Sequence, residues 1–208
     1  MIDICMLLMG DVTYDSRVLR EAEALASAGY DVVVLAVHDR EAGPPTEHRD
    51  GFTIWRITVQ RSPFTVVYHR ALLYPLNRLA AWLYQRQPAM VWHNLFMNAW
   101  RLWTMRYRTA VQAVRSTPAR VYHAHDYTAL LVLHAAGLRP LVCDSHELFF
   151  DRPMPDVFQG REAFYQTIIQ IERQQEADML RQVDCVITVG DLIADHMAEQ
   201  WGITRPVV

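Results

Sequence analysis

The sequence predicts an α/β fold: a doubly wound, mostly parallel sheet with helices on both faces. Short apolar runs of strand length alternate along the chain with segments of helical periodicity. Such alternation is typical of parallel strands that are joined by crossover helices. The 208 residues, 51% of them apolar, suffice for one large domain with a full core. We therefore expect a single domain over residues 1–208.

About six strands are expected, each an apolar run bounded by turn signals. They are predicted at residues 2–9, 32–37, 52–59, 120–124, 139–144 and 184–189. Residues 39–50 contain Gly43, Pro44 and Pro45 and are predicted to form a polar loop. Residues 206–208 are expected to begin a further strand.

Helices are predicted in the segments between these strands. The first helix follows Asp15, a good N-cap residue, and Gly29 comes after its last apolar position, as a C′ glycine should. A long helical stretch is expected at 65–115, where Pro75 kinks or divides it and Pro88 ends its first part. The remaining helices are predicted at residues 127–136, 161–181 and 191–201.

Charge is strongly segregated along the chain, although the net charge is only −3. Residues 51–125 contain ten arginines and no acid, whereas the flanking thirds together carry a net charge of −13. Between residues 64 and 115 the arginines are interleaved with aromatic residues, a composition that suits an anionic membrane surface. Core helices whose arginines pair with acids elsewhere explain it about equally well. Nucleic acid is the disfavoured partner.

The cysteines and the apolar runs indicate the compartment. Cys5, Cys143 and Cys185 lie in predicted strands and are odd in number, so we expect buried thiols in a reducing environment. No signal peptide or apolar stretch of transmembrane length is evident, which favours a cytoplasmic protein. His123 and His125 are too few to form a structural metal site alone, so no metal site is expected.

Two neighbouring strands are predicted to end in histidine–acid clusters. One runs from His123 to Asp126 and the other from Asp144 to Glu147. Ligands of open parallel sheets bind beyond the carboxyl ends of the strands, so these clusters predict a site. His146 is the catalytic candidate, because an imidazole can donate to a hydroxyl or a phosphate and can carry protons near pH 7. The alternative is a histidine that is hydrogen-bonded to the backbone at a loop start.

The loop after the first strand contains neither the dinucleotide glycine fingerprint nor a P-loop, which disfavours a nicotinamide dehydrogenase. Gly10 would let a substrate approach the backbone closely. Arg17 opposes the helix dipole, so a counter-ion from the protein or the substrate, or simple solvation, would explain it. For Asp126, helix capping is favoured over ligand binding. We expect His146 and the Gly10 loop to line one groove that is open to solvent.

These residues resemble the N-terminal domain of retaining GT-B glycosyltransferases, in the family 4-like group that includes sucrose synthase and the phosphatidylinositol mannosyltransferases. The resemblance rests on the segment from Asp15 to Ala22, on both histidine–acid clusters, on Glu172 and on the strand at 184–189. It covers nearly the whole chain. Residues 60–118 are the least typical part, and a helical insertion rich in arginine and aromatic residues is expected at about 62–118.

The resemblance implies that the chain is one half of a GT-B fold. This half would be a Rossmann-like acceptor-side domain, and the donor-binding C-terminal domain would lie outside the chain. The full enzyme would transfer a sugar, with retention, from a UDP- or GDP-sugar to a sugar, polysaccharide or lipid-linked acceptor without a cofactor. This half alone is expected to be inactive. Many such enzymes act at the cytoplasmic membrane face, so peripheral attachment to the inner face of the plasma membrane is also expected.

The resemblance places His146 near the transferred sugar and Gly10 near the donor phosphate and the acceptor. The expected substrate-binding residues are Gly10, Arg17, His125, Asp126, Ser145 and Glu147. The alternative function is a non-catalytic, stand-alone binding module that docks on a membrane or on a protein partner.

Overall fold

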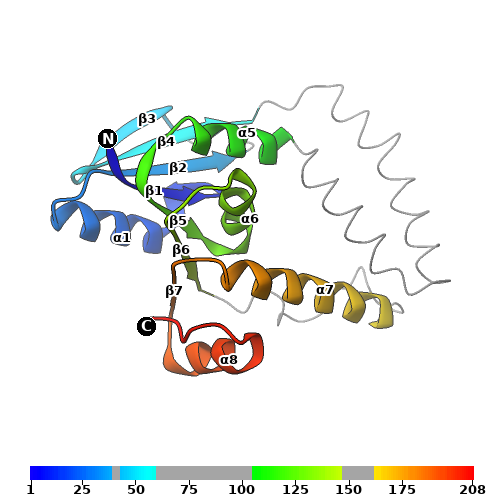
Figure 1. Cartoon of the computed structure of the whole chain (residues 1–208). Helices are drawn as coiled ribbons and strands as arrows, with labels where there is room; N and C mark the ends of the chain where they lie inside the picture. The colour runs from blue at the N-terminus through cyan, green and yellow to red at the C-terminus, as the bar shows by residue number, and fades with distance from the viewer. Residues whose placement is uncertain (39–42, 60–104, 147–161) are drawn as a thin grey trace, which may run out of the picture.

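The computed structural model describes residues 1–38, 43–59, 105–146 and 162–208. In this part of the chain the strands are β1 (Ile2–Leu8), β2 (Val32–His38), β3 (Thr46–Arg49), β4 (Phe52–Thr58), β5 (Ala119–His125), β6 (Leu141–Ser145) and β7 (Cys185–Thr188). They form one sheet in the order β3-β4-β2-β1-β5-β6-β7 (Figure 1). Only β3 is antiparallel to its neighbour. The predicted fold class is therefore confirmed.

The described helices begin with a single 3₁₀ turn, η1, and follow the predicted order. They are η1 (Val12–Tyr14), α1 (Ser16–Ser27), α5 (Met105–Arg115), α6 (Asp126–Ala136), α7 (Glu162–Leu180) and α8 (Asp191–Trp201). The predicted cap is confirmed, because Asp15 accepts a hydrogen bond from the backbone N–H of Val18 at 3.3 Å. Gly29 has a φ of 93°, a left-handed value that glycine adopts freely at a C′ position.

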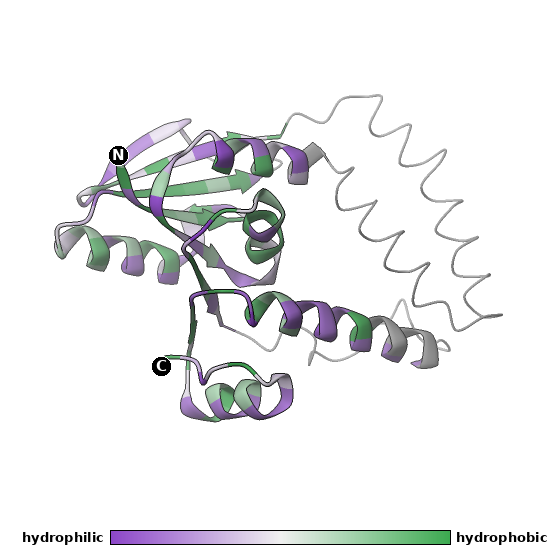
Figure 2. Cartoon of the chain, in the orientation of Figure 1, coloured by the Kyte–Doolittle hydropathy of each residue, from purple (hydrophilic) through white to green (hydrophobic). Residues whose placement is uncertain are grey.

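Two hydrophobic layers cover the two faces of the sheet. On one face, Val18 and Ala22 of α1 pack against β1, β2 and β4. On the other face, Ala110 and Val114 of α5 and most of α6 pack in a larger core. Because both faces are covered, β2 is buried along its whole length, which explains its uninterrupted apolar sequence. Figure 2 shows that β1 and β2 are largely hydrophobic, whereas hydrophilic residues recur along α1, α5 and α7.

One predicted loop is wrong in part, because residues 46–49 form the edge strand β3. This strand is almost entirely exposed and carries no apolar residue, so no hydrophobic pattern marks it. Its pairing with β4 is fixed by the turn at Asp50 and Gly51, which have φ values of 44° and 87°. Asp-Gly with two positive φ angles is a favoured hairpin turn, so the signal was present in the sequence.

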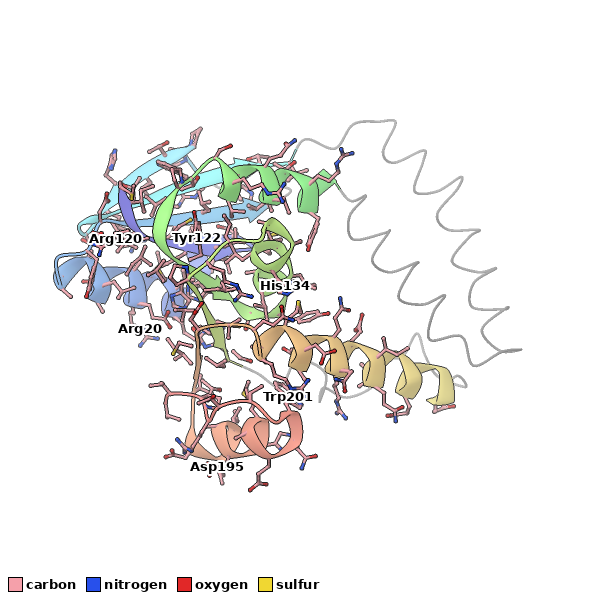
Figure 3. The ribbon with its side chains drawn as sticks, in the orientation of Figure 1. Arg20, Arg120, Tyr122, His134, Asp195 and Trp201 are labelled. Atoms are coloured by element: carbon pink, nitrogen blue, oxygen red, sulfur yellow. The ribbon has the colours of Figure 1, made fainter. Side chains whose placement is uncertain are left out.

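The C-terminal part of the chain packs through α7 and α8. Trp201, at the end of α8, is 7% exposed and belongs to the larger core, and its carbonyl accepts a hydrogen bond from Arg181, which follows α7 (Figure 3). Val207 forms a parallel bridge with Ile187, as expected for the start of a further strand.

Several predictions fall outside the described residues. These are the helical stretch at 65–104 with Pro75 and Pro88, the start of the polar loop at 39–42, and Glu147 with the segment that follows it. The described end of the predicted insertion is the helix α5, as expected. Two of the cysteines, Cys5 and Cys143, are buried free thiols, and Cys185 is partly buried.

Candidate functional site

Three strand ends define the candidate site. Leu8 of β1 is in register with His125 of β5, which is in turn in register with Asp144 of β6. From β1 the strand order runs through β2 to one side of the sheet and through β5 to the other. The carboxyl end of β1 is therefore the switch point where ligands bind in doubly wound sheets. Gly10 lies two residues after the end of β1 and His146 directly follows β6, so both lie at the same edge of the sheet.

Four side chains converge at this edge and are called here the strand-end cluster: Glu21, His125, Asp144 and His146. One nitrogen or oxygen atom of each lies within 4.8 Å of the others. The Oδ2 atom of Asp144 is 2.7 Å from Nε2 of His146 and 3.5 Å from Nδ1 of His125. The Oε2 atom of Glu21 is 3.9 Å from Nε2 of His125 and 3.9 Å from Nε2 of His123.

Three members of the strand-end cluster are buried and Glu21 is partly buried, yet several polar atoms of the cluster lack hydrogen-bond partners among the described residues. His125 and Asp144 are each 1% exposed and His146 is 6% exposed. Within the described part of the chain, no hydrogen-bond partner is found for either ring nitrogen of His125 or His146, or for the facing oxygens of Asp144 and Glu21. The 2.7 Å contact thus has the length of an ion pair without the direction of a hydrogen bond. Buried groups in this condition are costly, which indicates a ligand or a chemical task.

The environment shifts the acid–base properties of the cluster in opposite directions. Burial and the neighbouring charge of Asp144 raise the pKa of Glu21 to about 8. Burial alone would raise the pKa of Asp144, but its contacts with His125 and His146 hold it well below the usual range. The cluster therefore favours a charged Asp144 beside a protonated Glu21 at neutral pH.

The pKa values of His146 and His123 are shifted in opposite directions. Burial opposes the charged form of His146, but the contact with Asp144 outweighs it and raises the pKa of His146. Burial and the nearby His125 lower the pKa of His123 to about 3, so this imidazole is neutral. The environment therefore favours the charged form of His146, the predicted catalytic residue, and the neutral form of His123.

The remaining predicted residues surround the cluster in different ways. Arg17 is 3.9 Å from Asp15, which supplies the internal counter-ion, and its side chain is 43% exposed. A Cβ atom added to Gly10 would meet the side chain of Leu8 at 3.8 Å, an ordinary contact, so no described neighbour requires glycine there. Ser145 is the last residue of β6 and is 4% exposed.

Two findings differ from the sequence analysis. His125, not Asp126, occupies the N-cap position of α6, with no side-chain cap hydrogen bond, so the predicted capping role of Asp126 is wrong. Because β5 runs on to His125, the chain must turn within one residue, and Asp126 adopts a φ of 66°. His146 was expected in a groove open to solvent, but the imidazole is buried.

The sequence analysis missed Glu21 and Glu176. Glu21 lies on α1, four residues after Arg17 and next to the buried residues of that helix. An acid in this position was the sequence signal that could have identified Glu21 as a site residue. Glu176 of α7 is 2% exposed, and burial, together with the charges of Asp126 and Glu172, raises its pKa to about 8. No local pattern marked Glu176.

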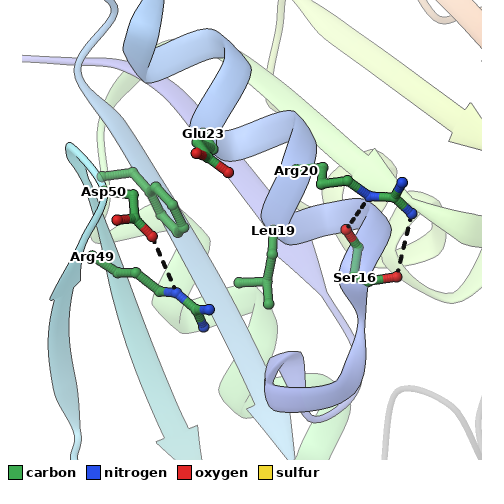
Figure 4. Close-up of a pocket in the computed structure, with 7 residues that line it drawn as sticks. Ser16, Leu19, Arg20, Glu23, Arg49 and Asp50 are labelled. Carbon is green, nitrogen blue, oxygen red and sulfur yellow. Dashed lines mark hydrogen bonds and ion pairs between the residues drawn. The ribbon is translucent and has the colours of Figure 1, made fainter.

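A hollow lies between α1 and the β3–β4 hairpin, away from the strand-end cluster. It is lined by Ser16, Leu19, Arg20, Glu23, Arg49, Asp50 and Phe52. Figure 4 shows that Arg20 bonds to Ser16 and Arg49 to Asp50. Since these pairs already satisfy its arginines, this hollow is a weaker candidate than the strand-end cluster.

Comparisons with known proteins agree with the fold. The family model described as "Glycosyl transferase 4-like domain" matches residues 14–208. Sucrose-phosphate synthase from Thermosynechococcus elongatus is similar to the chain with a TM-score of 0.54 and 16% identity, over 100% of this chain and 47% of that one. Two trehalose-phosphate synthases, which are UDP-forming, give lower scores. The Burkholderia xenovorans enzyme has a TM-score of 0.49 at 13% identity, over 96% of this chain and 42% of that one. The Burkholderia vietnamiensis enzyme has a TM-score of 0.48 at 15% identity, over 97% and 43%.

The chain thus spans less than half the length of these three solved structures. No curated protein matches the sequence.

Proposed function

Because this chain belongs to the glycosyl transferase 4-like family of retaining GT-B glycosyltransferases, we propose that it is the acceptor-side half of such an enzyme. The donor is a nucleotide-sugar, UDP- or GDP-linked, which the other half binds. The reaction joins the sugar to an acceptor hydroxyl with retention of configuration at the anomeric carbon. The observation that carries the proposal is the convergence of His125, Asp144 and His146 at the switch point of the sheet.

His146 is the residue proposed to act on the sugar. It directly follows β6, and its Nε2 atom is held 2.7 Å from the Asp144 carboxylate, which fixes the ring and favours its charged form. A charged imidazole stabilises negative charge that develops on phosphate or sugar oxygens during transfer. In retaining transfer the donor phosphate can take the acceptor proton, so His146 is assigned to orientation and stabilisation, with no obligatory role as a base.

The loop after β1 and the start of α1 are proposed to contact substrate. Gly10 leaves the backbone accessible, because an added side chain would meet no described atom closer than 3.8 Å. Arg17 is 43% exposed and retains a charge that is available to a phosphate, despite the distant pairing with Asp15. His125, Asp126, Ser145 and Glu147 complete the proposed set of substrate-binding residues.

The experiment compares variants in an enzyme that carries both halves of the GT-B fold. Release or transfer of sugar from UDP- and GDP-sugars is measured, and His146→Ala is expected to lower kcat by about 100-fold or more. His134→Ala is the matched control, because His134 lies on α6 and pairs with Gln182 (Figure 3). An enzyme unaffected by His146→Ala would contradict the proposed site.

We further propose a lipid-linked or polysaccharide acceptor, with peripheral attachment at the inner face of the plasma membrane. The support is the acid-free stretch from residue 51 to 125, with its ten arginines. Among the described residues of this stretch, Arg56 contacts Glu47, Arg115 contacts the last carbonyls of α6, and Arg120 contacts Asp3. Within the described ranges, no helix has the length and apolar character to cross a membrane.

Membrane attachment is tested by flotation with anionic and with neutral vesicles. Binding to anionic vesicles alone, weakened by salt, is the expected result. Equal recovery with neutral vesicles, or no recovery at all, would contradict the electrostatic attachment.

A further inference from the structure

We propose that Glu21 is a positioning residue of the proposed sugar transfer, which acts through Asp144 on the orientation and charge of the His146 ring. The inference rests on the proposed function, because it assigns a role within the site that His146 occupies there. Glu21 is not assigned any contact with the sugar or the phosphate. Its role is to complete the surroundings of the Asp144 carboxylate, which faces Nε2 of His146 at 2.7 Å.

The first observation is the face of the sheet on which Glu21 lies. This face, which α1 covers, is apolar at β1, where Leu8 belongs to the smaller core. It becomes polar at the next two strands, because Leu8 is in register with His125, and His125 with Asp144. His123, two residues before His125, shares the same face. Glu21 reaches this polar part from α1, and its Oε2 atom is 3.9 Å from Nε2 of both histidines.

Two carboxyl groups therefore share one site. One oxygen of Glu21 and one of Asp144 belong to the four cluster atoms that lie within 4.8 Å of one another. Asp144 is 1% exposed, and Oδ2 of Asp144 and Oε2 of Glu21 have no hydrogen-bond partner among the described residues. Two negative charges this close, away from bulk water, repel each other strongly. A single proton held between the two carboxyl groups removes the repulsion and supplies Asp144 with a donor.

The contacts of the two acids decide which of them keeps this proton. Burial alone would raise the pKa of Asp144, but its contacts with His125 and His146 hold that pKa well below the usual range. Burial and the charge of Asp144 raise the pKa of Glu21 to about 8. Glu21 is therefore the donor and Asp144 the acceptor at neutral pH. A protonated carboxyl group can fix the orientation of Asp144 without adding a second negative charge beside His146.

The alternative role for Glu21 is that of a counter-ion for a charged imidazole behind the site. His123 does not need one, because burial and the nearby His125 lower the pKa of His123 to about 3. The titratable and charged groups that surround Glu21 and His146 come from several elements: Arg17 of α1, His123 and His125 of β5, Asp126 of α6 and Asp144 of β6.

The proton on Glu21 also sets an upper pH limit for the site. As the pH rises through about 8, Glu21 ionises and Asp144 loses its donor. A second negative charge then stands near His146, whose task is to stabilise negative charge. Transfer is therefore expected to weaken over this range.

The first test uses the whole chain without any sugar, with its histidines labelled with ¹⁵N. Imidazole nitrogen shifts in NMR spectra report the protonation and hydrogen bonding of each ring, and His146→Ala assigns the His146 signals. At pH 7, Glu21→Ala is expected to move these signals, because Asp144 loses its donor. Glu21→Gln should restore them, since its amide N–H can still donate to Asp144. Glu23→Ala, at an exposed position of α1, is the matched control and should leave them unchanged. His146 signals that do not respond to Glu21→Ala would overturn the proposal, whether or not the enzyme transfers sugar.

The second test measures transfer by the enzyme with both halves, per folded protein. Glu21→Ala is expected to lower kcat about ten-fold and to change KM for the nucleotide-sugar by about two-fold or less, since Glu21 does not touch the substrate. Glu21→Gln should recover most of this loss at pH 7. Native kcat in Glu21→Ala, beside a strongly impaired His146→Ala, would remove Glu21 and leave the proposed function intact. Equal losses in Glu21→Ala and Glu21→Gln would show that a donor is not what the site requires, and would also overturn the proposal.

The pH profile separates positioning from a merely structural role. Glu21→Gln cannot ionise, so the ratio of native to Glu21→Gln activity should be constant below pH 7 and should fall as the pH rises through about 8. Ionisation of His146 or Glu176 affects both enzymes and so cancels in this ratio. A ratio that stays constant through this range would contradict the assignment of the proton to Glu21.

Discussion

Polar side chains at the amino edge of the sheet are hydrogen-bonded within the fold, whereas several at the carboxyl edge are not. At the amino edge, Asp3 accepts hydrogen bonds from the backbone N–H of Asp31 at 3.0 Å and from Arg120 at 3.2 Å (Figure 3). Asp184 likewise accepts from the backbone N–H of Leu141 at 2.8 Å. At the carboxyl edge, the buried atoms of His125 and His146 have no such partner among the described residues.

This difference separates structural polar groups from those that await a ligand. The acids of the amino edge connect neighbouring strands, and their hydrogen bonds are complete within the fold. The strand-end cluster is more deeply buried, yet incomplete, although buried polar groups are normally satisfied. Among the described residues, the atoms without partners include several gathered at the switch point, which favours binding at that edge.

The largest effect on stability is expected at Glu176, a buried acid near the carboxyl edge. Its pKa is raised from 4.5 to about 8, so the folded chain keeps a proton that the unfolded chain releases. Stability is therefore fully present below pH 4.5 and is lost progressively as the pH rises to about 8. Glu176→Gln, which stays neutral, should gain about 4 kcal/mol at pH 8 and nothing at pH 4.

Urea unfolding at a series of pH values measures this difference. Glu199→Gln, at an exposed position of α8, is the matched control and should not change the pH profile. Parallel profiles for the native chain and Glu176→Gln would show that this acid is not held protonated by burial.

The next largest effect is expected for a substitution at Gly10, and it should change activity without changing stability. Because Leu8, at 3.8 Å, is the only described neighbour that an added Cβ would meet, Gly10→Ala should change the free energy of unfolding by less than about 0.5 kcal/mol. A substrate that approaches the backbone closely would be displaced, and kcat/KM of the enzyme with both halves should fall about ten-fold.

Gly190→Ala provides the comparison for this variant. Gly190 has an extended backbone and follows β7, the third strand along from β1, and no described atom lies within 4 Å of the added Cβ. It should retain full activity. Equal activity of both variants would remove Gly10 from the site.

The smallest effect is expected at the amino edge. Asp184→Ala removes the acceptor for the N–H of Leu141 and should destabilise the chain by about 1 kcal/mol, without lowering activity per folded enzyme. Asp184→Asn keeps a carbonyl acceptor and should recover most of this loss. Loss of activity in Asp184→Ala beyond the loss of folded protein would contradict the division between the two edges.

Local patterns were sufficient for the elements that carry their own signal. The cap at Asp15, the glycine at 29 and the helix at 191–201 were predicted because each depends on residues a few positions apart. The strand β3 was missed because its exposed, polar residues are held only by pairing with β4. The Asp-Gly turn after it was the local signal that could have found it.

The candidate site was predicted only in part, for a related reason. His125 and His146 follow apolar strands, so their place at one edge could be derived from strand order alone. Their partner Glu21 lies on α1, far away in sequence, and only helix packing brings it within 3.9 Å of His125. Asp126 looked like a cap because its residue type fits, but the pairing of β5 extends the strand to His125.

The sequence by itself determined the α/β architecture, because alternating apolar strands and amphipathic helices can bury their surfaces in few other ways. It also determined that two histidine–acid clusters share one edge of the sheet. Only the tertiary structure decided that a glutamate of α1 completes the cluster and that its imidazoles are buried. Burial and contact between distant segments depend on how layers pack, and local residue patterns do not contain that information.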